Sequence, residues 1–326
     1  RLRKSNYLKN TVNNFEAITD KKEKLQKVYY WLSRQMEIND NYSSIFADDL
    51  KKVFENKKGT PTEQNLILTS LLKEMDYNAN PVILSTRDNG KVNQHFPLLD
   101  KFNYVICRVE LDGKFYNLDV SDPTLKMGML PYECLNGDGR EINNNGGQFI
   151  SFNSNEKYKS YEALDAKIDL QTGKIKGKIE QSNAGYKGHN LRKEFKKIGA
   201  EKMKESLKKD IKEMKVLNIN LENMEDQEKL QNIKMDFELT ESIGDEDILY
   251  ISPIFSGKIT ENPFKQPERN YPVDFGYGSD YTYKLTLEIP KQFGVESLPK
   301  NTNTTLGDKS GQFMYSCTFD AATNKI

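Results

Sequence analysis

The sequence predicts an α+β protein of two domains, in which a mixed helical and hairpin-bearing domain precedes a mostly antiparallel β domain with a helical insertion. Three observations predict this arrangement. Helical repeats of apolar residues fill the chain before residue 76, an Asp-Gly loop joins two alternating strands at residue 112, and period-two alternation dominates the second half. With 326 residues the chain is long enough for two domains. We place them at 1–155 and 156–326.

The composition excludes several classes of partner. Lys plus Arg and Asp plus Glu are balanced at 48 each, so the chain has no net field to attract nucleic acid or an anionic membrane. No run approaches the ~20 apolar residues of a membrane span, so we expect no transmembrane segment here. The chain begins with Arg1 and stops at Ile326 just after a strand-like segment. We therefore expect part of a longer protein, with the second domain truncated and any signal peptide or lipid anchor outside this chain.

The cysteines argue against a disulfide scaffold and a structural zinc site. Cys107, Cys134 and Cys317 are odd in number and unrelated in spacing, with no C-x-x-C pair and no Cys/His cluster. The aspartates form no calcium loop of the D-x-D-x-D-G type. We therefore expect neither a metal nor a cofactor.

The residues from 20 to 75 predict three helices. In 20–36, Asp20 is the N-cap, Glu23 stands at the third position, and an apolar face follows. A shorter helix is expected at 48–56. The third begins in the stretch 58–75.

This third helix has the clearest start signal in the sequence. Thr60 is the expected N-cap, Pro61 the first helical residue, and Glu63 completes a T-x-x-E capping box. A buried stripe then follows at helical spacing: Leu68, Leu71, Leu72 and Met75. Because free amides and the helix dipole favour negative charge at a helix N-terminus, this is also a position where an enzyme would hold a thiolate.

A hairpin follows, and its turn sets its register. The segments NYVICRVEL and KFYNLDV flank Asp112-Gly113, a two-residue loop that pairs Leu111 with Lys114 and, counting back, Tyr104 with Ser121. Tyr104 and Asp119 then lie diagonally on one face of the sheet, ~7–8 Å apart at the backbone. The turn therefore predicts that these two side chains meet.

The rest of the first domain is expected to contain less regular structure. We predict a strand at 81–87, a loop with His95 at 91–101, a loop with strand-like ends at 127–142, and a polar boundary at 143–147. In the second domain the patterns predict strands at 161–170, 174–182, 216–223, 230–240 and 281–289, with a helix at 186–214 interrupted at Gly199.

Five segments in order resemble the transglutaminase-like core of a bacterial multi-domain family. They are GTPTEQNLILTSLL from Gly59, NPVILSTR from Asn80, FNYVI from Phe102, LDGKFYNLDVSDP from Leu111 and GMLPYECLNG from Gly128. The resemblance covers 20–145 well and the NPF and YPVDFGY stretches of the second half weakly. It implies a papain-like cysteine protease fold, with flanking β domains and export to the cell envelope.

The resemblance also implies a catalytic site in which two of three residues are replaced. The family uses a cysteine at the helix N-terminus, a histidine on a following strand and an aspartate on the next strand. Matched residue by residue, these positions fall on Pro61, Tyr104 and Asp119, so only the aspartate is retained. Proline has no nucleophile, and tyrosine with an ordinary pKa of about 10 is no base near neutrality.

Four other residues are candidates for the same groove: Thr60, Thr62, His95 and Ser121. Of these, the Thr60 hydroxyl is committed to the helix cap. A loop histidine such as His95 is more often a surface residue than a catalytic one, although it could reach the site.

Three functional interpretations follow. The first is a catalytically inactive transglutaminase-like module with a binding or structural role in a periplasmic, cell-envelope or secreted protein, with an unidentified protein or glycan as ligand. The second is an active acyl-transfer enzyme with a non-standard nucleophile. The third is a carbohydrate-binding β module that uses aromatic side chains as stacking platforms: Tyr271, Phe275, Tyr277, Tyr281 and Tyr283.

Overall fold

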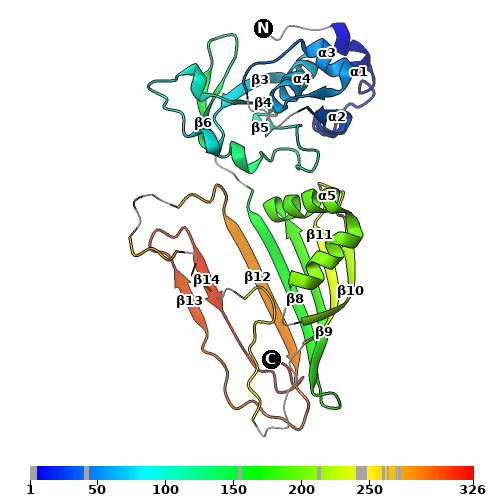
Figure 1. The fold of residues 1–326 in the computed structure, drawn as a ribbon, viewed down its shortest axis with the longest axis vertical. Helices are drawn as coiled ribbons and strands as arrows, with labels where there is room; N and C mark the ends of the chain where they lie inside the picture. Colours follow the sequence, from blue (N-terminus) through cyan, green and yellow to red (C-terminus); the bar gives the residue numbers. More distant parts are fainter. Residues whose placement is uncertain are drawn as a thin grey trace. The chain divides into compact units, whose positions relative to one another are not determined.

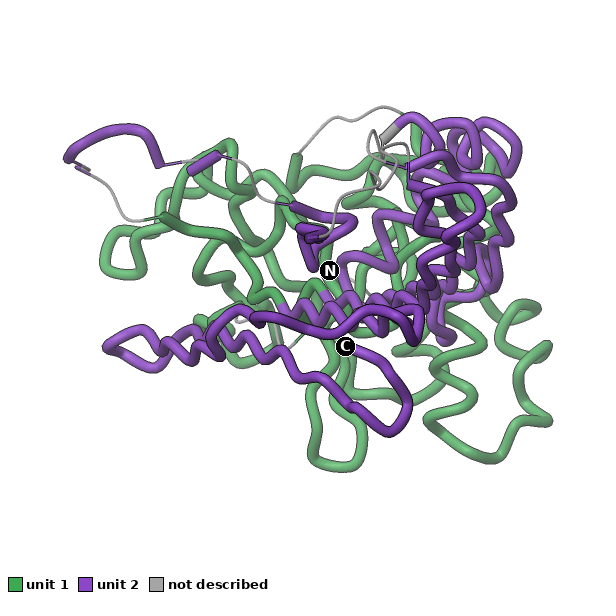
Figure 2. Tube along the Cα trace, turned by 90° about the horizontal axis from the view of Figure 1, so that it is seen from below, with its two compact units in different colours: residues 1–158, 273–279 green, residues 159–272, 280–326 purple. Residues whose placement is uncertain are grey.

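The computed structural model confirms the α+β class and divides the chain into two compact units (Figures 1 and 2). It describes residues 6–39, 44–152, 156–210, 214–239, 248–258, 261–262, 264–268, 270 and 273–326. Unit 1 comprises Arg1–Tyr158 and Val273–Ser279, and unit 2 comprises Lys159–Pro272 and Asp280–Ile326. The short segment from the second half that belongs to unit 1 was not predicted from the sequence.

The predicted helices of unit 1 are present with small shifts at their ends. They are α2 (Lys21–Gln35), α3 (Leu50–Asn56) and α4 (Pro61–Glu74), preceded by the short helices η1 (Asn6–Leu8) and α1 (Lys9–Asn13). The Asp20 side chain caps α2 by accepting the N–H of Glu23 at 2.7 Å. Side-chain oxygens likewise cap α3 and α4, so capping sets where α2, α3 and α4 begin.

The start of α4 is the predicted capping box. The Thr60 hydroxyl accepts the N–H of Glu63 at 3.3 Å, and the Glu63 carboxylate accepts the N–H of Thr60 at 2.8 Å. The other Glu63 oxygen accepts the N–H of Asp48 at 2.9 Å, which ties the preceding loop to the helix. After the helix, Asp76 adopts the left-handed conformation at φ 59°. Both ends of α4 are therefore fixed by local chemistry.

A five-stranded antiparallel sheet packs against α4. Its order is β5-β4-β3-β6-β7. The strands are β3 (Asn78–Leu84), β4 (Tyr104–Leu111), β5 (Lys114–Leu118), β6 (Gly137–Glu141) and β7 (Gln148–Phe152). The predicted hairpin register is confirmed, with Leu111 opposite Lys114 and Cys107 opposite Leu118. A further short parallel pair joins β1 (Glu37–Ile38) to β2 (Lys58–Gly59).

Three segments of this unit differ in part from their predictions. The segment 127–142 ends in a strand, β6, as predicted, but also contains the 3₁₀ turn η4 (Tyr132–Cys134). The boundary predicted at 143–147 is wrong, because these residues form the β6–β7 hairpin loop. The Asn143 side chain accepts the N–H groups of Asn145 and Gly147, so the polar run closes a turn. The strand predicted at 81–87 ends at Leu84, and η2 (Arg87–Asn89) follows.

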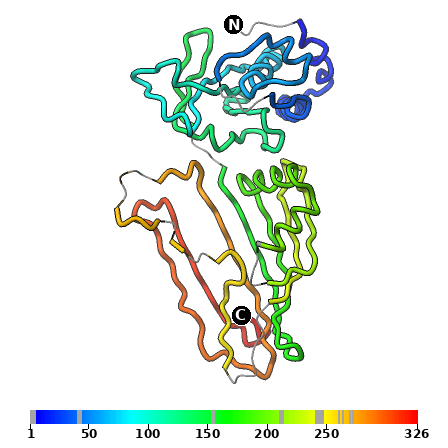
Figure 3. Tube along the Cα trace, viewed as in Figure 1, coloured from blue at the N-terminus to red at the C-terminus, as the bar shows by residue number. Residues whose placement is uncertain are grey.

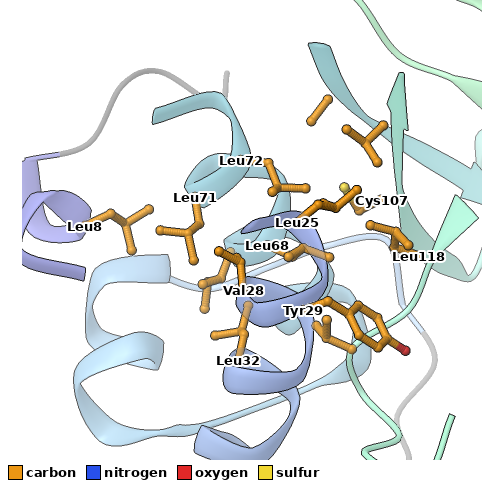
Figure 4. Packing of buried hydrophobic residues seen from close by; sticks show 14 of the residues in the cluster. Leu8, Leu25, Val28, Tyr29, Leu32, Leu68, Leu71, Leu72, Cys107 and Leu118 are labelled. Carbon is orange, nitrogen blue, oxygen red and sulfur yellow. The ribbon is translucent and has the colours of Figure 1, made fainter. Parts of the chain in front are cut away.

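The core of unit 1 lies between α2, α4 and the sheet (Figure 4). Fully buried leucines from both helices meet Cys107 and Leu118 from the central hairpin. The Cys107 thiol is on the face of β4 opposite to Tyr104, and burial raises its pKa to about 12. It is a core residue, as the alternation of the strand predicted.

Unit 2 is built around a second five-stranded sheet, ordered β10-β11-β9-β8-β12 (Figure 1), and Figure 3 traces the course of its chain. Its strands are β8 (Tyr158–Asp169), β9 (Lys174–Ala184), β10 (Met214–Glu222), β11 (Gln231–Leu239) and β12 (Ser279–Glu288). The helical insertion α5 (Gly185–Asp210) packs on β9, β10 and β11 and is interrupted at Gly199, as predicted. It does not extend to 214, because Met214 begins β10. A small hairpin pairs β13 (Thr302–Thr305) with β14 (Gln312–Tyr315).

The described residues contain neither a membrane-spanning helix nor a cluster of metal-ligating side chains. None of the helices that the structure describes is long and apolar enough to cross a membrane. Within the same residues there is no group of three or more His, Cys, Asp and Glu side chains that could hold a metal ion.

Candidate functional site

Asp119 is the centre of a buried polar cluster at the end of the central hairpin. Its side chain is fully buried and its carboxylate accepts four hydrogen bonds. Oδ1 accepts the Asn65 amide at 3.1 Å, the Ser121 N–H at 2.9 Å and the Ser121 hydroxyl at 2.7 Å. Oδ2 accepts the Tyr104 hydroxyl at 2.8 Å. The two residues that the turn predicted to meet therefore share a direct hydrogen bond.

Asn65 of α4 positions this cluster by bridging two strands. Its Nδ2 donates to the Val105 carbonyl at 3.0 Å, and its Oδ1 accepts the Val120 N–H at 2.9 Å. The register that continues from β4 and β5 would place Val105 opposite Val120, so the side-chain amide takes the place of a ladder hydrogen bond there. The helix, both strands and the aspartate are thus joined through one buried side chain.

The hydroxyl groups of Tyr104 and Ser121 lie 3.1 Å apart and complete a closed ring with the carboxyl group. When the carboxylate is ionised, both hydroxyls donate to it. When it is protonated, its Oδ2–H donates to the Tyr104 oxygen, the Tyr104 hydroxyl donates to Ser121, and the Ser121 hydroxyl donates to Oδ1. The ring therefore accommodates either protonation state without a change in the positions of its heavy atoms.

Burial controls the protonation of this cluster. It raises the pKa of the Asp119 carboxyl, against the opposing effect of the hydrogen bonds from Ser121, Asn65 and Tyr104. Burial, and then the nearby Asp119, raises the pKa of the Tyr104 hydroxyl well above its ordinary value. The same two causes, in the same order, raise the pKa of the Cys134 thiol. Neither Tyr104 nor Cys134 is therefore ionised near neutrality.

These shifts predict how Asp119→Asn changes stability with pH. An amide can occupy the ring as the protonated acid does, by donating to Tyr104, so the variant should fold. Folding raises the pKa of Asp119 above its ordinary value of 3.8. The stability that the protonated Asp119 contributes is therefore complete below pH 3.8 and is lost as pH rises through the pKa of the folded state. The free energy of unfolding of the wild type, measured with urea, should therefore fall relative to that of the variant as pH rises across this window.

Asp274→Asn provides the matched control of opposite sign. The Gly276 N–H, and then Arg87, lower the pKa of Asp274, so its contribution is present above 3.8 and is lost as pH falls through the lowered value. A difference between wild type and Asp119→Asn that is independent of pH would contradict the assignment.

Pro61 lies on the same side of α4 as Asn65, one helical turn earlier. Because residues four apart share a helix face, Pro61 is on the face of α4 from which Asn65 donates to Asp119. Pro61 is half-buried. The neighbouring hydroxyls are engaged: Thr60 caps the helix, and Thr62 is buried and donates to the Ser44 carbonyl.

The structure does not bring His95 into this cluster. Its side chain is exposed, and its backbone N–H donates to the side chain of Asn93 at 2.9 Å. It lies in the loop before η3 (Leu99–Lys101). This is the surface position that a loop histidine usually takes.

Sequence reasoning missed Asn65, Tyr29 and Cys134. The Tyr29 hydroxyl of α2 donates to the Asp119 carbonyl at 2.7 Å, so a second helix supports the cluster. For Asn65, the available sequence signal was the polar run Glu63-Gln64-Asn65 on a helix with a buried apolar stripe. In the structure all three of these side chains are buried. Polar residues buried in this way require fixed partners.

Comparisons with known proteins identify two parts of the chain. The model of the transglutaminase-like superfamily matches residues 9–120, and a domain of unknown function with a solved structure, DUF3858, matches residues 247–326. A search of curated proteins found no match.

Solved structures also match, at low similarity. A proposed protease from Parabacteroides distasonis ATCC 8503 is 12% identical with a TM-score of 0.37, and the match covers 74% of this chain and 51% of that one. A TGase is 15% identical with a TM-score of 0.26, covering 35% and 30%. A proposed cysteine protease from Cytophaga hutchinsonii is 13% identical with a TM-score of 0.29, covering 47% and 55%. The matches thus span from about a third to about half of each of these chains. The protein is therefore a multi-domain protein that carries a transglutaminase-like superfamily domain at residues 9–120 and a DUF3858 domain at residues 247–326.

Proposed function

We propose that the transglutaminase-like domain is catalytically inactive and acts as a binding or structural module. The observation that supports this most strongly is the environment of Asp119. The carboxylate that would orient an imidazole in an active relative is hydrogen-bonded to a tyrosine, a serine and an asparagine. No histidine faces it among the residues that the structure describes.

The other groups near the site also lack the required chemistry. The proposed nucleophile position, Pro61, has no reactive atom. Acyl transfer needs a base that accepts a proton near neutrality, and the raised pKa of Tyr104 rules out its phenolate at that pH. The Cys134 thiol is fully buried, and its raised pKa keeps it protonated and poorly nucleophilic.

This proposal predicts no acyl transfer by the wild-type chain. We expect no incorporation of a fluorescent amine into a glutamine-donor peptide, and no cleavage of casein, above the rate in buffer alone. The samples to compare are the wild type, His95→Ala and Asp119→Asn, with an active transglutaminase as the assay control. Turnover by the wild type that is lost in either variant would refute the proposal and would favour an enzyme with a non-standard nucleophile.

Two of the aromatic residues considered for glycan binding are engaged in other contacts. Tyr277 packs on Tyr132, with ring centroids 5.7 Å apart, and the Tyr283 hydroxyl is hydrogen-bonded to the backbone at Pro253 and Phe255. Phe275 and Tyr281 are exposed but belong to different units, and Tyr271 lies outside the described residues. A protein ligand is therefore the better proposal.

We extend this proposal to the cellular location, following the family resemblance. The full-length protein is proposed to reside in the periplasm or cell envelope or to be secreted. Fractionation of cells that express the full-length gene tests this, and recovery in the cytosolic fraction would contradict it.

A further inference from the structure

A segment from the second half of the chain is part of unit 1. Residues Val273–Ser279, called the strap below, belong to the compact unit formed by Arg1–Tyr158 (Figure 2). The strap contains the sequence Asp274-Phe275-Gly276-Tyr277-Gly278. It contacts the Arg87 guanidinium, the Tyr132 ring and the Tyr158 backbone.

Arg87 is the central contact of the strap. Its guanidinium donates to the Asp274 carbonyl at 2.8 Å and lies 3.4 Å from the Asp274 carboxylate. It also donates to the Leu135 carbonyl at 2.7 Å and lies 4.7 Å from the centre of the Tyr132 ring. One planar cation therefore joins the strap to the segment 132–136.

Gly276 allows the strap to approach closely, and Gly278 contributes a backbone contact. Gly276 has φ +74°, and a Cβ atom there would lie 2.8 Å from the Tyr132 ring and 3.2 Å from the Arg87 guanidinium. Any side chain would therefore push the strap away from both residues. Gly278 contributes a backbone hydrogen bond, because its carbonyl accepts the Tyr158 N–H at 2.9 Å.

The segment that the strap contacts contains a buried cysteine near the Asp119 cluster. Cys134 lies between Tyr132 and Leu135 in the sequence, is fully buried, and interacts electrostatically with both Asp119 and Tyr104. On its other side, the Asn136 amide donates to the carbonyls of Ser85, Thr86 and Gly90. The strap therefore supports Tyr132 and Leu135, and Asn136 anchors the far end.

We propose that the strap is an intramolecular partner of the Arg87–Tyr132 surface and holds the segment 132–136 in place, so that Cys134 stays buried. Detachment of the strap opens this segment and exposes the Cys134 thiol, while the core around Cys107 stays closed. The proposal holds whether or not the cluster is catalytic.

The three cysteines allow a direct test on the full chain. Iodoacetamide modification of each thiol is followed over time by peptide mapping in the wild type, Arg87→Ala and Gly276→Ala. We expect the rate at Cys134 to rise about tenfold or more in both variants, the effect of losing one charge-assisted hydrogen bond that opposes local opening. The rate at the deeply buried Cys107 should not change, and the partly exposed Cys317 serves as the reactive reference.

Gly146→Ala is the matched control. Gly146 also has a positive φ of +97°, but a Cβ atom there would meet nothing within 4 Å. It therefore adds the same type of backbone strain without displacing the strap. An unchanged rate at Cys134 in Arg87→Ala and Gly276→Ala would overturn the proposal. An equal rise at Cys107, or the same rise in Gly146→Ala, would also overturn it, because either result indicates general destabilisation.

Discussion

Pro61→Cys combined with Tyr104→His is expected to create a thiol that titrates well below the ordinary cysteine value of about 8.5. The start of α4 supplies free amides and the positive end of the helix dipole, which favour a thiolate. Asp119 is already placed to accept a hydrogen bond from the side chain of residue 104, as it does from the Tyr104 hydroxyl at 2.8 Å. An imidazolium there would stabilise the thiolate further. The loss of the proline should cost only about 1 kcal/mol of stability.

The rate of iodoacetamide modification of the introduced thiol as a function of pH measures this effect. Pro61→Cys alone is the control, because it has the helix terminus without the imidazole and should titrate at a higher pH than the double variant. A background with Cys317→Ser removes the partly exposed native thiol. If the introduced thiol titrates at the ordinary value in both variants, or resists modification in both, residue 61 does not face the cluster and the proposed triad positions are wrong.

Asn65→Leu is expected to cause the largest loss of stability, about 3–5 kcal/mol in the free energy of unfolding. Leucine has the same branched skeleton as asparagine, but its methyl groups are larger and form no hydrogen bond to any of the Asn65 partners. The change leaves the Val105 carbonyl and the Val120 N–H without their bridge and removes one donor from the buried Asp119 carboxylate. Urea unfolding of the full chain, followed by a unit 1 signal such as Trp31 fluorescence, measures the loss.

Ser70→Ala on the same helix is the matched control. Ser70 is also buried and polar, but its hydroxyl donates only to the Leu66 carbonyl within α4, at 2.9 Å. That carbonyl keeps its helical N–H partner, so the loss should be below about 1 kcal/mol. Equal losses in the two variants would show that the bridge made by Asn65 has no special role.

The sequence predicted the parts of this site that depend on local rules. The capping box at Thr60 and Glu63 is determined by four consecutive residues, and the Asp-Gly turn determines the strand register. Side chains alternate between the two faces of a strand, so this register places Tyr104 and Asp119 on the same face. Their contact could therefore be predicted without a structure. The positions of α2, α4 and β4 followed from apolar periodicity in the same way.

The parts that could not be predicted depend on contacts between distant residues. Asn65 is one polar residue in a buried helix, and nothing in its neighbours indicates that it bridges two strands. The β6–β7 hairpin was missed because the polar run at 143–147 resembles a domain boundary as much as a turn. The strap lies far from Arg87 in the sequence, and no periodicity connects the two.

The central claim is that the transglutaminase-like domain has kept its scaffold and lost its nucleophile and base. Probe labelling of the wild-type chain tests it most directly. A fluorophosphonate, which reacts with activated hydroxyls, and iodoacetamide, which reacts with thiolates, would be applied separately and the labelled residues identified by peptide mapping. We expect no labelling by the fluorophosphonate and iodoacetamide labelling confined to the partly exposed Cys317. Stoichiometric labelling of Thr60, Thr62, Ser121 or Cys134 would contradict the claim.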